Sequence, residues 1–377
     1  MNRSPSAWRG PELAAREDEW IHRLTADEVA ELEDAHAQWR ARGAGTMETM
    51  TRLDFPLPRF GRVLAALGEE IESGRGFGFL RGLPVGRWGV EASRDIYWGL
   101  ANHLGAPVRQ NARAERLVKV RDEGGAEKAT SRAPQSRSNL NFHSDFCEVV
   151  GLLCINAAKS GGVSRICSTH AILERMEAEH PEYLPVFEQG FHFFRKGEEA
   201  VGEPPVSARR LPMLDRSGKL PMFLYWPGFA TQGAHFSGVP LTQLEKDALS
   251  FVNRVACDAS YHLDTHFQPG DVQFLNNYRI THSRTEFEDW PEPERQRYLE
   301  RIWLRTSEPR NLPPGFTDLH GPNSLLEGFP IVPPELVAER ELALQALSQR
   351  LAAGAAPQMY LGSSGPLEIS GSPAAGR

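Results

Sequence analysis

The apolar positions of the chain follow a helical period near the N-terminus and a strand period in the middle. The capping box Thr25-Ala-Asp-Glu28 begins one helix, which apolar spacing predicts up to Gly43. Two further helices are expected at about 61–72 and 92–104, the second ending at Gly105. Helices should therefore gather in the N-terminal part of the chain.

Short apolar runs bounded by turn residues indicate strands. They lie at 76–82, 117–121, 146–158, 163–167 and 298–305. A further strand opens at the turn Pro269-Gly-Asp271 and has His282 at its end. Helices are also expected after Ser168 or Thr169 and after the capping box Thr242-Gln-Leu-Glu245.

This order of elements favours a β sandwich or barrel decorated by helices over a doubly wound parallel sheet. No GxGxxG or GxxxxGK[ST] segment supports a nucleotide-binding alternative. Residues 195–240 are rich in Pro, Gly and Arg, and residues 122–138 form a second polar stretch, so both are expected to be loops and the first a lid or substrate loop.

We expect one domain over residues 1–354, followed by a Gly/Ser/Ala/Pro tail at 355–377 that should be disordered. The domain comprises a helical N-terminal part at about 1–105, a β core at about 106–306 and a C-terminal helix at about 334–351.

Composition excludes several classes of protein. The 377 residues carry a formal net charge of -7 without a basic run, which argues against a nucleic-acid partner. No apolar stretch approaches the roughly 20 residues that a membrane span needs, and the N-terminal residues lack the apolar core of a signal peptide. The four cysteines show no CxxC spacing and are expected to be buried thiols. A cytoplasmic protein is therefore expected.

The segment Asn139-Leu-Asn-Phe-His-Ser-Asp145 carries candidate chemistry. Residues i and i+2 of a strand share a face, so an extended segment would project His143 and Asp145 together. With one more histidine they would form the two-histidine, one-carboxylate set that suits non-haem Fe(II). The plainer interpretation is that the spacing His-x-Asp at 143–145 occurs by chance. His282 is a candidate third ligand, whereas His262 and His266 lack the glutamate of an HExxH zinc motif.

Two arginines share a strand face with apolar residues. Period two places Arg297, Leu299, Arg301 and Trp303 on one side of the predicted strand. Arginine is seldom buried without a partner, and its planar guanidinium suits carboxylates. The alternative is a solvent-facing side paired with surface acids near residues 292–294.

Several segments occur in a characteristic order over about residues 75–306: Asn-Phe-His143-Ser-Asp145, Ala-Lys159-Ser-Gly-Gly162-Val-Ser164, Gly270-Asp-Val-Gln-Phe-Leu-Asn-Asn277, His282 and Arg297-x-x-x-Arg301-x-Trp-Leu. This set resembles the Fe(II)/2-oxoglutarate-dependent dioxygenases of the taurine dioxygenase and clavaminate synthase type. The resemblance implies a mainly β fold with peripheral helices around a double-stranded β-helix core of the jelly-roll or cupin-like kind.

The resemblance also implies roles for particular residues. His143, Asp145 and His282 would bind Fe(II). Arg297 would hold the distal carboxylate of the cosubstrate 2-oxoglutarate, with the Ser164 hydroxyl as a second donor and Arg295 as a rival for the first role. Arg301 and Asn139 match positions that face the primary substrate; a loop asparagine bonding locally is the alternative for Asn139.

The implied activity consumes O2 and oxidises an unactivated C–H bond of a small carboxylate-bearing substrate, an amino acid or a derivative. Hydroxylation is preferred over desaturation or cyclisation, and the carboxylate of Asp145 argues against halogenation. The competing functions are a cupin-like zinc-dependent hydrolase or isomerase, a small-molecule binding protein, and a protein that has lost activity. The expected partner is a small-molecule substrate, with no nucleic acid and no membrane, and with assembly into a homo-oligomer left open.

Overall fold

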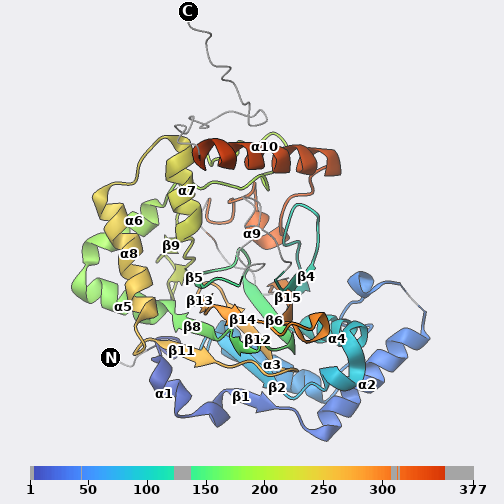
Figure 1. Cartoon of the computed structure of the whole chain (residues 1–377). Helices are drawn as coiled ribbons and strands as arrows, with labels where there is room; N and C mark the ends of the chain where they lie inside the picture. Colours follow the sequence, from blue (N-terminus) through green and yellow to red (C-terminus); the bar gives the residue numbers. More distant parts are fainter. Residues whose placement is uncertain (1–3, 44, 123–136, 307–311, 313–314, 353–377) are drawn as a thin grey trace, which may run out of the picture.

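Two β-sheets surrounded by helices make up the computed structural model, which describes residues 4–43, 45–122, 137–306, 312 and 315–352 (Figure 1). The larger sheet has the order β1–β2–β12–β6–β15–β3, and β4 also pairs with β15. Only β1 and β2 are parallel among these pairs of described strands. The strands are β1 (Ile21–Arg23), β2 (Phe77–Arg81), β3 (Ala106–Pro107), β4 (Leu117–Val120), β6 (Val149–Asn156), β12 (Val272–Asn276) and β15 (Tyr298–Arg305).

The smaller sheet is antiparallel, with the order β11–β8–β13–β5. Its strands are β5 (Leu140–His143), β8 (Ser164–Ser168), β11 (His262–Thr265) and β13 (Ile280–Arg284). Phe79, Val150 and Trp303 of the larger sheet belong to the same buried apolar cluster as Ile166 and Ile280 of the smaller one. The two sheets therefore share one core, as packed sheets do.

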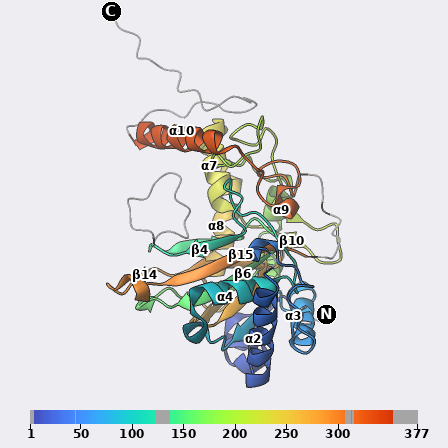
Figure 2. The same cartoon turned by 90° about the vertical axis from the view of Figure 1, so that its right-hand side faces the viewer.

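Three helices cover the other face of the larger sheet (Figure 2). They are α2 (Ala26–Ala41), α3 (Phe60–Glu72) and α4 (Val85–Ala101). Both hydrogen bonds of the predicted capping box are present at the start of α2, between Thr25 and Glu28. In α3 the buried residues Phe60, Leu64, Leu67 and Ile71 recur at helical spacing. These apolar stripes explain why the N-terminal helices dock on the sheet.

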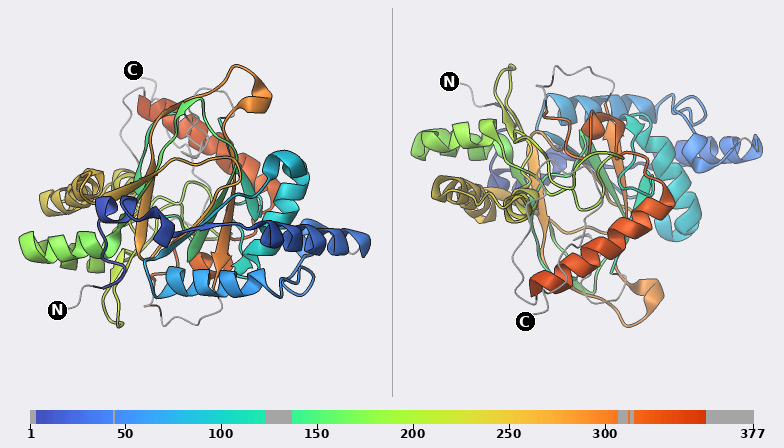
Figure 3. Two further views of the ribbon diagram at one scale, coloured as in Figure 1. Left: turned by 90° about the horizontal axis from the view of Figure 1, so that it is seen from below. Right: turned by 90° about the horizontal axis from the view of Figure 1, so that it is seen from above.

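Helices also flank the smaller sheet and close the far end of the molecule. α5 (Thr169–Glu179) and α8 (Gln243–Cys257) pack beside β8 and β5, and Ser168 caps α5. Seen from above, α10 (Pro334–Ala352) runs over the end of the sheets (Figure 3). The remaining elements are α1 (Gly10–Ala14), α6 (Leu184–Gln189), α7 (Pro227–Ser237), α9 (Ser324–Glu327), β7 (Ser160–Gly161), β9 (Leu214–Asp215), β10 (Met222–Phe223), β14 (Phe287–Glu288) and short 3-10 helices at Glu17–Glu19, Met47–Thr49, Pro181–Tyr183 and Pro293–Arg295.

Most predicted elements are confirmed, and three differ. The helix expected from 92 begins at Val85 and bends at Gly89, whose φ of 75° is left-handed. The 195–240 stretch contains the unpredicted helix α7 as well as short strands. The single strand expected up to His282 is two strands, β12 and β13, because the chain turns at Asn277–Arg279. Most of the loop at 122–138 and the tail at 355–377 lie outside the described residues, and the limits of the single domain stay a prediction.

Across the described part of the chain, the helices are too short or too polar to cross a membrane.

Candidate metal centre and cosubstrate site

His143 and His282 face each other across two neighbouring strands. They are direct partners in the antiparallel register of β5 and β13, and their ring centroids are 4.4 Å apart. One ring nitrogen from each histidine and one carboxylate oxygen of Asp145 all lie within 4.8 Å of one another. The fold therefore brings the distant His282 to the neighbouring pair His143 and Asp145, so that the three candidate ligands meet.

The strand argument for the pair His143 and Asp145 is only partly correct. β5 ends at His143, and Asp145 lies beyond it in the connection to β6. The buried side chain of Asn277 holds this connection, because its Oδ1 accepts a hydrogen bond of 2.9 Å from the backbone N–H of Asp145. Ser144 is fixed from the other side, since its N–H donates to Tyr225 O and its Oγ accepts from the Tyr225 N–H. The turn after β12 thus positions Asp145.

The two histidines are held in the neutral form that a metal ligand requires. Nδ1 of His143 lies 2.9 Å from Asn141 O, so this nitrogen carries the proton and Nε2 keeps its lone pair. Burial lowers the pKa of His143, and burial together with the closeness of His143, which disfavours protonation of both rings, lowers the pKa of His282 to about 3. Nδ1 of His282 is buried without a hydrogen-bond partner in the described part of the chain. This orphaned nitrogen and the donor set fit a divalent metal.

The carboxylate of Asp145 is paired with Arg301 and Trp303 of β15. Arg301 Nη1 lies 3.2 Å from Oδ1, and the indole N–H of Trp303 donates to Oδ2 at 3.1 Å. Burial raises the pKa of Asp145, but Arg301, the two histidines and Trp303 outweigh it and lower the pKa overall. The buried face predicted for this strand is confirmed, with Arg301 and Trp303 3–5 % exposed. Arg301 thus contacts the candidate metal ligand, which sequence reasoning did not foresee.

Arg297 has the features of a site for an anion. Its side chain is 5 % exposed, Nη1 has no hydrogen-bond partner in the described residues, and burial lowers its pKa to about 10. A Cβ placed on Gly162 would lie 3.3 Å from Arg297 Nε, so the glycine leaves room beside the guanidinium. Ser164 follows Gly162 by two residues, and its Oγ donates to Gln273 Oε1 at 3.2 Å. Gln273 Nε2 is also without a hydrogen-bond partner among the described residues. The unpartnered donors Arg297 Nη1 and Gln273 Nε2 fit the distal carboxylate of 2-oxoglutarate, and the Ser164 hydroxyl could donate to it only by giving up its bond to Gln273.

Arg295, the other candidate for binding the distal carboxylate, lies outside this site. The side chain of Arg295 is half exposed, with its guanidinium 3.6 Å from the centre of the Trp290 ring. Sequence reasoning missed Arg284, which shares a strand face with His282. Arg284 and Arg297 both lie near the Phe287 ring, at 4.7 and 5.1 Å, and burial together with Arg297 lowers the pKa of Arg284 to about 10. Because Arg295 is half exposed whereas Arg297 is buried, Arg297 is the better candidate for binding the cosubstrate carboxylate.

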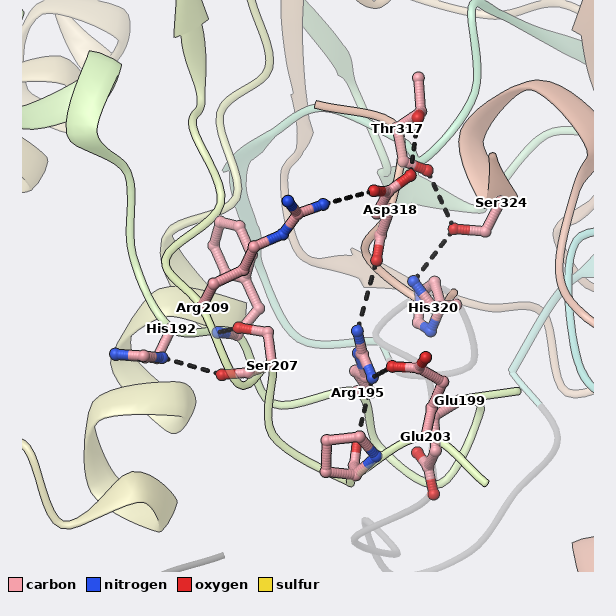
Figure 4. Close-up of polar contacts among 12 residues, drawn as sticks. His192, Arg195, Glu199, Glu203, Ser207, Arg209, Thr317, Asp318, His320 and Ser324 are labelled. Carbon is pink, nitrogen blue, oxygen red and sulfur yellow. Dashed lines mark hydrogen bonds and ion pairs between the residues drawn. The ribbon is translucent and has the colours of Figure 1, made fainter. Parts of the chain in front are cut away.

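The excursion formed by residues 195–240 docks on the C-terminal segment at 315–329 (Figure 4). Arg195 donates to Glu203 at 2.7 Å and to Asp318 O at 3.4 Å, and Arg209 reaches the Asp318 carboxylate at 2.7 Å. His320 in this segment is fully buried and packs edge-on against Phe146, the neighbour of Asp145. The excursion and the C-terminal segment together therefore cover the ring next to the metal centre.

Asn139 is exposed, and its Nδ2 donates to the side chain of Asn141 at 3.2 Å. Its expected contact with substrate stays a prediction. Two other residues beside the centre, Asn277 and Gln110, were missed as functional positions. Asn277 accepts from the Asp145 N–H, and Gln110 Oε1 accepts a hydrogen bond of 2.8 Å from Arg301 Nε. Both contacts join residues far apart in the sequence, so local patterns do not indicate them.

Comparison with known proteins agrees with this geometry. Residues 40–303 match the family described as "Taurine catabolism dioxygenase TauD, TfdA family". FR-33289 synthase of Streptomyces rubellomurinus is 30% identical over 299 residues, covering 78% of this chain and 88% of that protein. The taurine hydroxylase-like protein SAT17 of Stachybotrys chartarum is 28% identical over 329 residues, covering 82% of each.

Solved structures share the fold at low sequence identity. An asparagine oxygenase in complex with Fe(II), 2S,3S-3-hydroxyasparagine and succinate superimposes with a TM-score of 0.61 at 17% identity, over 76% of this chain and 93% of that one. The non-heme iron oxygenase OrfP in complex with Fe, succinate and (3S)-hydroxy-L-Arg gives 0.56 at 16% identity, over 76% and 94%. The chain belongs to the taurine catabolism dioxygenase TauD, TfdA family and is an Fe(II)- and 2-oxoglutarate-dependent dioxygenase.

Proposed function

We propose that this dioxygenase oxidises an unactivated C–H bond of a small carboxylate-bearing substrate, an amino acid or a derivative, with hydroxylation as the favoured outcome. His143, Asp145 and His282 bind Fe(II), Arg297 and Ser164 bind 2-oxoglutarate, and the two sheets are the double-stranded β-helix of this architecture. The observation that carries the proposal is the meeting of the three ligand atoms within 4.8 Å, with the histidines on the paired strands β5 and β13 and Asp145 in the connection that follows β5.

Each residue has a task that follows from its surroundings. Fe(II), 2-oxoglutarate and O2, when bound, supply the oxidising chemistry that breaks the C–H bond. His143 and His282 stay neutral near pH 7 because their pKa values are lowered, so each offers a lone pair, while Asp145 stays ionised. Arg297 faces the distal carboxylate of 2-oxoglutarate as a buried cation, and Phe146, packed on Trp226 with ring centroids 4.8 Å apart, keeps water from the centre.

The substrate class is supported by two structural neighbours. The asparagine oxygenase is bound to a hydroxyasparagine and OrfP to a hydroxyarginine, so both complexes contain an oxidised amino acid. In this chain Arg301 would attract the acidic group of such a substrate, because Fe(II) would share the negative charge of Asp145 that Arg301 now balances. Asn139 would contribute from the edge of β5.

Succinate formation from 2-oxoglutarate tests the proposal. The wild type, supplied with Fe(II) and O2, should release succinate, and His143→Ala should abolish this release. Arg297→Ala should raise the 2-oxoglutarate concentration needed for half-maximal turnover by about 10- to 100-fold, since hydrogen bonds to a charged group contribute roughly 1.5–3 kcal/mol. Arg295→Ala is the matched control, because its half-exposed guanidinium lies outside the site, and should behave as wild type.

Two results would contradict the proposal. If neither His143→Ala nor Arg297→Ala lowered turnover, the residue assignments would be wrong. A tight zinc site that does not respond to 2-oxoglutarate, found by metal analysis after anaerobic purification, would favour a zinc-dependent hydrolase. A weak visible charge-transfer band on adding Fe(II) and 2-oxoglutarate is the result expected here.

A further inference from the structure

Trp303 has a polar contact that the roles above do not use. Its side chain is 3 % exposed, and its indole N–H donates to Oδ2 of Asp145 at 3.1 Å. A buried indole packs well without any hydrogen bond, as Trp226 does, whose Nε1 has no partner in the described residues. Packing alone therefore does not require the hydrogen bond from Trp303, and this bond belongs to the metal centre.

We propose that Trp303 is a positioning residue for the metal: its N–H holds Oδ2 of Asp145, so that the carboxylate presents Oδ1 as its single ligand oxygen. This inference rests on the proposed function, because it takes Asp145 to be a metal ligand.

The choice of oxygen follows from acceptor capacity. A carboxylate has about two lone-pair sites on each oxygen. Oδ2 accepts from Trp303 at 3.1 Å and also lies 3.4 Å from Arg301 Nη1, which occupies both of its sites. Oδ1 has only the contact with Arg301 at 3.2 Å among the described side chains. Oδ1 thus retains the lone pair that a metal needs. One oxygen of this carboxylate lies within 4.8 Å of a ring nitrogen of each histidine.

The two donors are themselves rigid. Arg301 and Trp303 stand two residues apart on β15, with the Arg301 guanidinium 4.8 Å from the centre of the Trp303 ring. Arg301 Nε donates to Gln110 Oε1 at 2.8 Å, and the fully buried Gln110 returns a bond of 2.8 Å to Arg301 O. Phe329 packs on the outer side of Trp303, with ring centroids 5.7 Å apart.

A rigid donor fixes the Asp145 carboxylate before metal arrives. The carboxylate therefore loses less conformational freedom when the metal binds. Supporting hydrogen bonds of this kind change metal affinity by about 10- to 100-fold in other metal sites. Trp303 would therefore affect metal binding itself, before cosubstrate or substrate arrives.

The test measures the affinity of the metal-free protein for Co(II) under anaerobic conditions, by competition with a chelator. Trp303→Phe removes the N–H and should weaken Co(II) binding by about 10- to 100-fold. Trp226→Phe makes the same change of ring in the same buried apolar cluster but removes no hydrogen bond, and should stay within about threefold of wild type. Melting curves of each metal-free protein report whether it is folded.

A second replacement separates the N–H from the shape of the ring. Trp303 exchanged for 3-benzothienylalanine keeps the two fused rings and puts sulfur in place of the N–H. It should weaken Co(II) binding as Trp303→Phe does, while its melting temperature stays close to that of wild type. This variant keeps the test decisive if Trp303→Phe does not fold.

The outcomes are distinct. Wild-type affinity in the benzothienyl variant would overturn the inference while leaving the metal site itself in place. An equal loss in Trp226→Phe would also overturn it, because packing would then explain the effect. A wild-type protein that binds no divalent metal at all would overturn the proposed metal site, and this inference with it.

Discussion

Arg301 Nη1 lies 3.2 Å from Oδ1 of Asp145, so the arginine expected to meet the substrate is paired with the carboxylate expected to bind the metal. Both side chains are almost completely buried. A buried ion pair of this kind is costly to break from one side, because the remaining charge has lost both water and its partner. The pair therefore links the stability of the metal-free protein to the metal centre.

Arg301→Gln should lower the free energy of unfolding of the metal-free protein by about 3–5 kcal/mol, since Asp145 is left as an uncompensated buried charge. Saturating Co(II) should recover most of this loss, because the metal then balances the carboxylate and binds only the folded state. Urea unfolding with and without Co(II) measures both quantities. Arg165→Gln, which breaks the exposed pair with Asp264, is the control and should cost less than about 1 kcal/mol. Equal losses in the two variants would contradict the prediction.

Ser164→Ala should raise the KM for 2-oxoglutarate by about 2- to 12-fold with little change in kcat, which corresponds to one neutral hydrogen bond of roughly 0.5–1.5 kcal/mol. Ser164→Thr keeps the hydroxyl and should keep the wild-type KM. Steady-state succinate release at varied 2-oxoglutarate checks both variants. A Ser164→Ala enzyme with unchanged KM would show that this hydroxyl serves only Gln273.

Arg195→Leu should loosen the excursion from the C-terminal segment, because Arg195 is buried and bonds Glu203, Pro204 O and Asp318 O. Amide hydrogen exchange at 195–207 and 317–324 should speed up, and 2-oxoglutarate turnover without substrate should rise as water reaches the centre. Arg209→Leu removes an exposed contact with the same Asp318 and should change exchange much less. Similar exchange in both variants would mean that Arg195 does not hold the two segments together.

His170→Gln should weaken the pH dependence of stability below about pH 6.5. Burial lowers the pKa of His170, whose Nε2–H donates to Pro221 O at 2.9 Å. The unfolded histidine takes up a proton near pH 6.5, whereas the folded one takes it up only at lower pH. The unfolded state then binds more protons, so stability falls as pH falls, by up to about 1.4 kcal/mol per pH unit for this group. Urea unfolding across this range compares the slopes, and an unchanged slope would contradict the assignment.

The sequence by itself determined the local elements and the list of candidate residues. Capping boxes at Thr25 and Thr242 depend on neighbours within a few residues, and these predictions are confirmed. The residues expected to be buried along β15 are buried, although the residues between them are buried too. The turn at Asn277–Arg279 and the helix α7 were missed, because no clear Gly or Pro signal marks the first and Pro, Gly and aromatic residues obscure the helical period of the second.

Only the tertiary structure decided how the candidates meet. The pairing of β5 with β13 sets His143 opposite His282, and Asn277 of a distant turn holds Asp145 beside them. Trp303 and Arg301 reach Asp145 from the other sheet, across the shared core. Local spacing can place residues on a strand face, but contacts across a hundred or more residues depend on which strands pair and which sheets pack, and that is a property of the whole fold.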